Sequence, residues 1–167
     1  MKFQYIIIRG PLGCGKSTIS EKLAKKLDAT HIAYDRIVDG RGLNRDKEEG
    51  YISQRSFFKA NDIAVGEAKK FFDSEKVVIF DGNFYWKSQL DDLIEKLNDS
   101  KGIVFTLKAL VETCIKRDSE RDKTHGEVAA RVVHKKSTSF TYGNEIDTDG
   151  RSSEETVNEI LEELRLR

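Results

Sequence analysis

Short apolar runs alternate along the chain with longer stretches whose apolar residues recur every three or four positions. The short runs predict strands at residues 3–9, 31–34, 76–80, 102–108 and 144–147. The longer stretches predict helices at residues 17–27, 48–73, 87–98, 111–121, 126–138 and 153–165. Short apolar strands separated by amphipathic helices are typical of a parallel sheet with both faces covered. The pattern therefore predicts an α/β fold whose ligands bind at the carboxyl ends of the strands.

The first predicted strand is followed by an octapeptide suited to binding phosphate. Residues 10–17 read GPLGCGKS and match the pattern GxxxxGK[ST] in full. Glycines let successive backbone N–H groups face phosphate oxygens, and the following helix directs its N-terminal dipole at the same anion. We expect Lys16 to act as a catalytic cation at the β- and γ-phosphates, and Ser17 to offer its hydroxyl to Mg²⁺. The residues expected to bind the nucleotide, ATP, are Gly10, Pro11, Leu12, Gly13, Cys14, Gly15, Lys16, Ser17 and Thr18.

Two aspartates directly follow predicted strands, where ligands bind in such a fold. Asp35 follows residues 31–34, and Asp81 follows the apolar run at 76–80. Asp35 could accept the proton of an acceptor hydroxyl and orient its oxygen toward the γ-phosphate, or it could simply cap a turn or the next helix. Asp81 fits a Walker B carboxylate, which holds Mg²⁺ directly or through water. The pattern also allows these two aspartates to exchange roles.

Two arginines lie four positions apart in the predicted helix at residues 111–121. Arg117 and Arg121 therefore share one helix face, which in isolation would favour a solvated surface with ion pairs. With a phosphate loop in the same domain, two guanidinium groups suit a polyphosphate and the charge of its transition state. We assign Arg117 to nucleotide binding, Arg121 to catalysis, and residues 117–136 or so to a small helical lid. Candidates for contacting the second substrate follow Asp81 and are Asn83, Tyr85 and Lys87.

Composition limits the class of protein. The 167 residues are the length of one domain, and 29 Lys+Arg balance 29 Asp+Glu, which argues against a surface built wholly for nucleic acid. No apolar run approaches the roughly 18 residues that a membrane span needs. The N-terminus lacks the pattern of a signal peptide, and two cysteines make neither a metal motif nor a disulfide framework. We therefore expect a single cytoplasmic domain over residues 1–167, with no membrane contact.

The order of these motifs resembles the small P-loop kinases of the polynucleotide 5′-hydroxyl kinase and zeta-toxin-like group, over about residues 3–138. The resemblance rests on the P-loop, the acid after the second strand, Asp81-Gly82-Asn83, and IKRDSER at residues 115–121. It implies a three-layer α/β/α P-loop NTPase fold with a five-stranded parallel sheet, Asp35 as general base, and Arg121 or Arg117 at the transferring phosphate. Gly82 departs from the group's usual Asp-Thr-Asn, and residues 36–38 lack its usual second acid and Arg.

Three functions compete on these residues. The first is an ATP-dependent phosphotransferase acting on a hydroxyl of a small molecule, a nucleoside or a nucleic-acid 5′ end. The second is a P-loop ATPase or nucleotide switch that acts through a partner, and the third is a P-loop used for binding alone. The Asn-Lys-x-Asp tetrapeptide of GTPases does not occur, and an intact Lys16 and Ser17 weigh against mere binding. We favour the phosphotransferase, with the acceptor and the oligomeric state left open.

Overall fold

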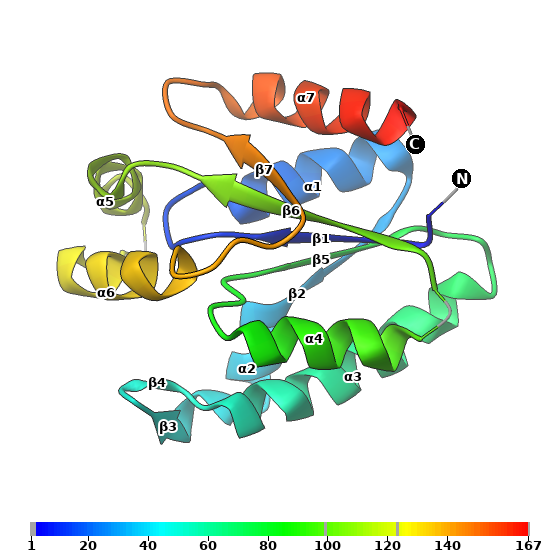
Figure 1. The fold of residues 1–167 in the computed structure, drawn as a ribbon, viewed down its shortest axis with the longest axis horizontal. Helices are drawn as coiled ribbons and strands as arrows, with labels where there is room; N and C mark the ends of the chain where they lie inside the picture. Colours follow the sequence, from blue (N-terminus) through cyan, green and yellow to red (C-terminus); the bar gives the residue numbers. More distant parts are fainter. Residues whose placement is uncertain (1–2, 99, 123, 167) are drawn as a thin grey trace.

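The computed structural model describes residues 3–98, 100–122 and 124–166. A parallel five-stranded sheet forms its centre, in the order β2-β5-β1-β6-β7 (Figure 1). The strands are β1 (Tyr5–Arg9), β2 (Thr30–Ala33), β5 (Val78–Gly82), β6 (Gly102–Lys108) and β7 (Asn144–Asp147). The predicted α/β P-loop fold with its five parallel strands is thereby confirmed.

Helices cover both faces of this sheet (Figure 1). One face packs against α1 (Lys16–Leu27) and α7 (Ser153–Arg165), and the other against α3 (Gln54–Phe72) and α4 (Lys87–Leu97). Alternate residues of each strand supply the two cores: Ile6 and Ile8 face α1 and α7, whereas Ile7 faces α3 and α4. Because its strands are buried on both faces, the sheet has the continuous apolar runs from which it was predicted.

Two further helices, α5 (Val111–Ser119) and α6 (Glu127–Ser137), lie beyond the carboxyl end of β6 (Figure 1). The fully buried Arg9 guanidinium joins the end of β1 to this region, because it donates to the Ser137 carbonyl at 2.6 Å. The same group donates to the Phe84 carbonyl at 3.4 Å and stacks 4.2 Å from the centre of the Phe140 ring. The C-terminal end of α6 is therefore fixed to the centre of the sheet.

The structure corrects two predicted elements. The helix expected at residues 48–73 starts only at Gln54, and before it come a short 3₁₀ helix, η1 (Leu43–Arg45), and a hairpin of β3 (Lys47–Glu48) and β4 (Tyr51–Ile52). The hairpin turns at Gly50, whose φ is +84°, and Ser53 caps α3 by accepting from the Ser56 N–H. Tyr34, expected as the last residue of a strand, instead begins the short helix α2 (Tyr34–Gly40).

Candidate active site

The phosphate loop connects β1 to α1 and is tightly packed. Gly13 and Gly15 have φ values of +82° and +96°, a region that favours glycine. A Cβ on Gly13 would lie 2.2 Å from the Cys114 carbonyl oxygen, so α5 packs directly against the loop. Side chains are thus excluded where the loop turns, and its backbone can approach a ligand closely.

Lys16, the first residue of α1, is buried, and its Nζ donates to the Pro11 carbonyl oxygen at 2.8 Å. The first turn of α1 continues with Ser17, Thr18 and Ile19, so no carboxylate offsets the positive end of the helix dipole. A phosphate at this end would meet both the ammonium group and the free backbone N–H groups. The loop has the geometry and charge of an anion site.

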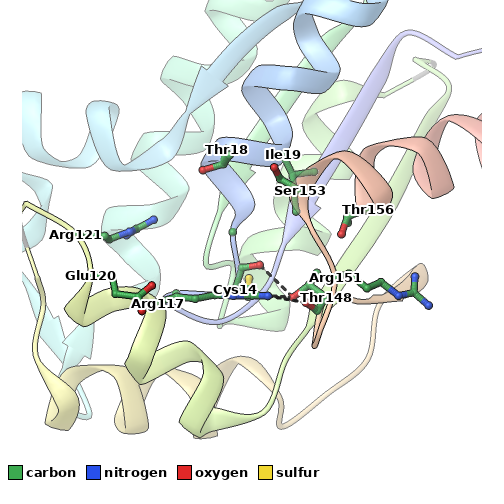
Figure 2. Close-up of a pocket in the computed structure, with 12 residues that line it drawn as sticks. Cys14, Thr18, Ile19, Arg117, Glu120, Arg121, Thr148, Arg151, Ser153 and Thr156 are labelled. Atoms are coloured by element: carbon green, nitrogen blue, oxygen red, sulfur yellow. Dashed lines mark hydrogen bonds between the residues drawn. The ribbon is translucent and has the colours of Figure 1, made fainter.

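One side of the loop borders a cavity of about 310 Å³, here called the α1–α7 cavity (Figure 2). Arg117 donates from Nη1 to the Thr148 hydroxyl at 3.0 Å and from Nη2 to the Thr148 carbonyl at 2.7 Å. The Thr148 hydroxyl lies 3.3 Å from the Cys14 carbonyl, which links α5 to the phosphate loop. The described residues that line the cavity are Gly13, Cys14, Gly15, Thr18, Ile19, Arg117, Glu120, Arg121, Thr148, Arg151, Ser153 and Thr156.

Arg121 lines the same cavity as Arg117 but not from the same helix face. The predicted helix at residues 111–121 ends at Ser119, so Arg121 lies beyond it in the segment that leads to α6. Both arginines therefore border the phosphate loop, although for a different structural reason than the four-residue spacing suggested.

Asp81 lies in β5 and is 2% exposed. Its Oδ2 is 3.0 Å from His31 Nε2, a contact between neighbouring strands that orients the carboxylate. Carboxylate and hydroxyl oxygens are the ligands that Mg²⁺ prefers, often beside phosphate oxygens of a nucleotide. The donor set of Asp81 and Ser17 therefore fits Mg²⁺. His31, for which the sequence analysis assigned no role, orients this carboxylate.

A second and larger cavity, about 620 Å³, lies on the other side of the loop and is here called the α2–α6 cavity. Its described lining residues are Leu12, Asp35, Val38, Asp39, Lys47, Gly50, Tyr51, Ile52, Asn83, Tyr85, His125, Val128, Ala129, Val132 and Val133. The predicted substrate residues Asn83 and Tyr85 are brought together here with Asp35. Lys87 instead pairs with Asp91 at 2.8 Å and is not among the described lining residues.

Asp35 lies in the first turn of α2, and its carboxyl opens into the α2–α6 cavity. The Asp35 side chain is exposed, yet partial desolvation by the surrounding protein raises the pKa of this carboxyl, the Lys16 ammonium lowers it, and the charges of Asp81 and Asp39 raise it further. Asp35 is thus electrostatically coupled to both the phosphate loop and the Asp81 carboxylate. A raised pKa makes this carboxylate a better proton acceptor than an ordinary aspartate.

The β3–β4 hairpin and α6 both border this cavity. Tyr85 Oη accepts from the Ile52 N–H at 3.0 Å, and Trp86 Nε1 donates to the Ile52 carbonyl at 2.8 Å. Lys136 of α6 pairs with Glu49 at 2.9 Å, and its Nζ lies 3.7 Å from the centre of the Trp86 ring. The sequence did not reveal this hairpin, whose strands are two residues each and carry no alternation long enough to recognise.

His125 is a lining residue that the sequence did not identify as functional. Its Nδ1 lies 3.1 Å from Oδ1 of Asp118, whose Oδ2 accepts from the backbone N–H groups of His125 at 2.8 Å and Gly126 at 3.1 Å. Burial raises the pKa of Asp118, but these hydrogen bonds outweigh it and the pKa is lowered. An ionised Asp118 therefore accepts a hydrogen bond from Nδ1–H of His125 and leaves Nε2 for other contacts. A His seven residues after an Asp matches no functional motif, so the sequence alone does not indicate this pair.

The chain belongs to the AAA domain family, whose model matches residues 6–145. This match spans the phosphate loop, all described lining residues of the α2–α6 cavity, and all of the sheet except Tyr5 of β1 and the last two residues of β7. A comparison of the sequence with curated proteins finds no match.

Solved structures of kinases share the fold over nearly their whole length. A gluconokinase from Sinorhizobium meliloti 1021 has a TM-score of 0.73 at 13% identity, covering 99% of this chain and 98% of that one. The Mycobacterium tuberculosis APS kinase CysC, in complex with AMPPNP and APS, has a TM-score of 0.70 at 16% identity and covers 98% of each chain. A shikimate kinase from Acinetobacter baumannii, in complex with shikimate, has a TM-score of 0.61 at 20% identity, covering 97% and 93%.

These comparisons support the broader of the sequence-based expectations. The P-loop class and the fold are confirmed, whereas the narrower resemblance to polynucleotide 5′-hydroxyl kinases and zeta-toxin-like proteins is not. They lend no support to a nucleic-acid 5′ end as acceptor. No helix within residues 3–98, 100–122 and 124–166 has the length and apolar character to cross a bilayer.

Proposed function

We propose that this protein is an ATP-dependent phosphotransferase that moves the γ-phosphoryl group to a hydroxyl of a small-molecule acceptor. The observation that carries the proposal is that Asp35 lines a second cavity, the α2–α6 cavity, across the phosphate loop from the α1–α7 cavity. A nucleotide in the α1–α7 cavity with its phosphates on the loop would direct its terminal phosphate toward the α2–α6 cavity. The kinases that share the fold support a kinase function, since their names are those of kinases of small molecules.

In the proposed reaction, the acceptor hydroxyl oxygen attacks the γ-phosphorus while the bond to the β–γ bridging oxygen breaks and ADP leaves. Asp35 orients the hydroxyl and accepts its proton. Lys16 and Arg121 offset the charge of the transferring phosphoryl group, and Arg117 holds the nucleotide beside Thr148. Mg²⁺, held by Ser17 and Asp81, would neutralise charge on the β- and γ-phosphates. The end of α5 and α6, about residues 117–136, serve as the lid.

A large cavity beside Asp35 favours this function over an ATPase whose acceptor is water. Water needs far less than the roughly 620 Å³ that the α2–α6 cavity provides, a volume within the range of small-molecule sites. The Asp35 carboxyl would have no organic hydroxyl to orient in an ATPase. The two functions therefore differ in what Asp35→Asn does to ATP turnover with and without an acceptor.

The test measures ADP release over nucleosides, oligonucleotide 5′ ends, sugars and small alcohols, first with the wild type and then with Asp35→Asn. Acceptor-dependent ADP release should fall by roughly 10²–10⁴-fold in Asp35→Asn. Binding of AMPPNP and slow hydrolysis of ATP by water should persist. Asp28→Asn, an exposed aspartate at the end of α1, is the matched control. If Asp35→Asn changes the Mg²⁺ dependence of nucleotide binding instead, Asp81 becomes the better candidate for the base.

A further inference from the structure

The α2–α6 cavity has an apolar wall, and the part of it that α6 provides is exposed. Val128 and Val132 of α6 line it and are 78% and 44% exposed, which is unusual for large aliphatic side chains on a helix packed at one end of a domain. Val133, Val38 and Ile52 continue the wall from α6, α2 and β4. These side chains lie in the same cavity as Asp35, so an acceptor whose hydroxyl reaches Asp35 would lay the rest of its body along them.

The charges in this cavity disfavour an anion. Asp35 and Asp39 lie one turn apart on α2 and both line the cavity. The basic side chains among the described lining residues are Lys47 on the hairpin and His125. Nδ1 of His125 already faces Asp118. Arg117 and Arg121 border the α1–α7 cavity instead. None of the described lining residues is an arginine, the side chain that commonly binds a carboxylate or phosphate through two parallel N–H donors.

Polar groups that line the cavity can still orient a neutral ligand. Asn83 lines the cavity, and its buried Oδ1 has no hydrogen-bond partner among the described residues. A buried amide oxygen without a donor is costly, so a hydroxyl or amine donor on a ligand would relieve that cost. Asp39 accepts from Asn44 at Oδ1, which leaves the rest of its carboxylate to interact with a donor or a cation.

From this lining we infer that the acceptor is a hydroxyl compound with an apolar body and no anionic group, neutral or cationic overall. The inference rests on the proposed function for the identity of the site, but it concerns binding and can be tested without turnover. It sets this chain apart in substrate class from a kinase whose acceptor is an acid.

The test uses three compounds that share one phenylpropane skeleton and differ in charge: 3-phenylpropane-1,2-diol, phenylalaninol and 3-phenyllactate. Their binding to the AMPPNP-loaded full chain is measured by calorimetry, with glycerol as a hydroxyl compound that lacks the apolar body and shikimate as a second anion. The neutral diol and the cationic phenylalaninol should bind at least tenfold more tightly than 3-phenyllactate, glycerol or shikimate. Tighter or equal binding of either anion, or failure of both the diol and phenylalaninol to bind, overturns the inference.

Two substitutions locate the effect in the cavity. Val132→Asp places a charge on the exposed apolar wall and should weaken binding of the diol by roughly tenfold or more, while AMPPNP affinity stays unchanged. Leu166→Asp, at an 83% exposed apolar residue outside both cavities, should leave diol binding unchanged and serves as the control. Asp39→Asn removes one carboxylate and should improve 3-phenyllactate binding severalfold without weakening the diol. Unchanged diol binding in Val132→Asp would place the compound elsewhere and contradict the inference.

Failure of the proposed function gives a different result from failure of this inference. Binding of the diol that depends on Val132, without acceptor-dependent ADP release from any compound, supports the ligand class and contradicts phosphotransfer. Acceptor-dependent ADP release with anionic compounds alone supports phosphotransfer and contradicts the ligand class.

Discussion

The Lys16 ammonium donates to the Pro11 carbonyl within its own loop, and a phosphate would replace that carbonyl as its partner. Lys16→Ala should lower ATP-supported turnover by at least roughly 10²–10³, because a cation at the transferring phosphate is lost from a preorganised site. The measurement is ADP release together with AMPPNP binding by calorimetry. Lys25→Ala, an exposed lysine further along α1, is the control. Wild-type affinity and turnover in Lys16→Ala would show that the loop does not bind the nucleotide's phosphates.

Asp35 is held at a cost to stability that should be visible in a pH series. Partial desolvation is the largest cause of its raised pKa, so the folded state binds a proton at Asp35 more readily than the unfolded chain does. Stability from this residue therefore falls as pH rises from the ordinary carboxyl pKa, about 3.9, through the raised folded value. Because the Asp35 side chain is exposed, solvent screens this effect, and Asp35→Asn should raise the melting temperature at pH 7 by about 1 °C or less, with the difference shrinking toward pH 4. A variant less stable than the wild type at pH 7 would show that the carboxylate is favourably paired.

Residues differ in how far a sequence can reveal them. Lys16 and Ser17 follow from a contiguous motif in which each position has a chemical reason, and Asp35 and Asp81 follow from the rule about strand ends. His125 does not, because its link to Asp118 depends on how the segment between α5 and α6 turns back, and nothing local encodes that turn. His31 was likewise invisible, since its contact with Asp81 joins β2 to β5 across 50 residues.

At the scale of elements, α6 begins where Asp118 gathers the backbone N–H groups of His125 and Gly126. The lowered pKa of Asp118 means that its contribution to stability is present above the ordinary carboxyl pKa and is lost as pH falls through the lower folded value. Asp118→Ala should cost roughly 1.5–3 kcal/mol, because it leaves those donors without their charged acceptor. Amide exchange at the start of α6 and thermal unfolding measure the effect.

Asp122→Asn, an exposed aspartate four residues later, is the control for Asp118→Ala. Equal exchange rates at His125 and Gly126 in wild type and Asp118→Ala would mean that the carboxylate does not hold the start of α6.

Element boundaries were predictable where apolar residues recur at regular spacing. They were not predictable where a few contacts between distant residues determine the local structure. The sheet strands and the long helices bury regular apolar faces, and their positions followed from the pattern. The β3–β4 hairpin was missed because Trp86, Tyr85 and Lys136, all distant in sequence, hold it in place. The short α2 was missed because its seven residues span under two helical turns, too few to show a period.

For the whole molecule, ligand binding and folding should be linked through the phosphate loop, because the loop joins β1 to α1 and packs against α5. With AMPPNP and Mg²⁺ at about 100 times the dissociation constant, the added stability is about 2.7 kcal/mol, or roughly 5–10 °C in melting temperature for a chain of this size. Chelation of Mg²⁺ should reduce that shift, and AMP should give a smaller one. No shift with AMPPNP and Mg²⁺ would contradict nucleotide binding by the folded state.

The contact between the phosphate loop and α5 also gives this protein an internal chemical reporter. Cys14 lies in the loop and Cys114 lies opposite it on α5; both are fully buried, and burial raises the pKa of both thiols, that of Cys114 to about 12. Alkylating reagents react with exposed thiolates, so they would label only those molecules in which the loop has separated from α5. The labelling rate would therefore count such separations directly, and a ligand that holds the two together would slow it, with no probe added to the chain.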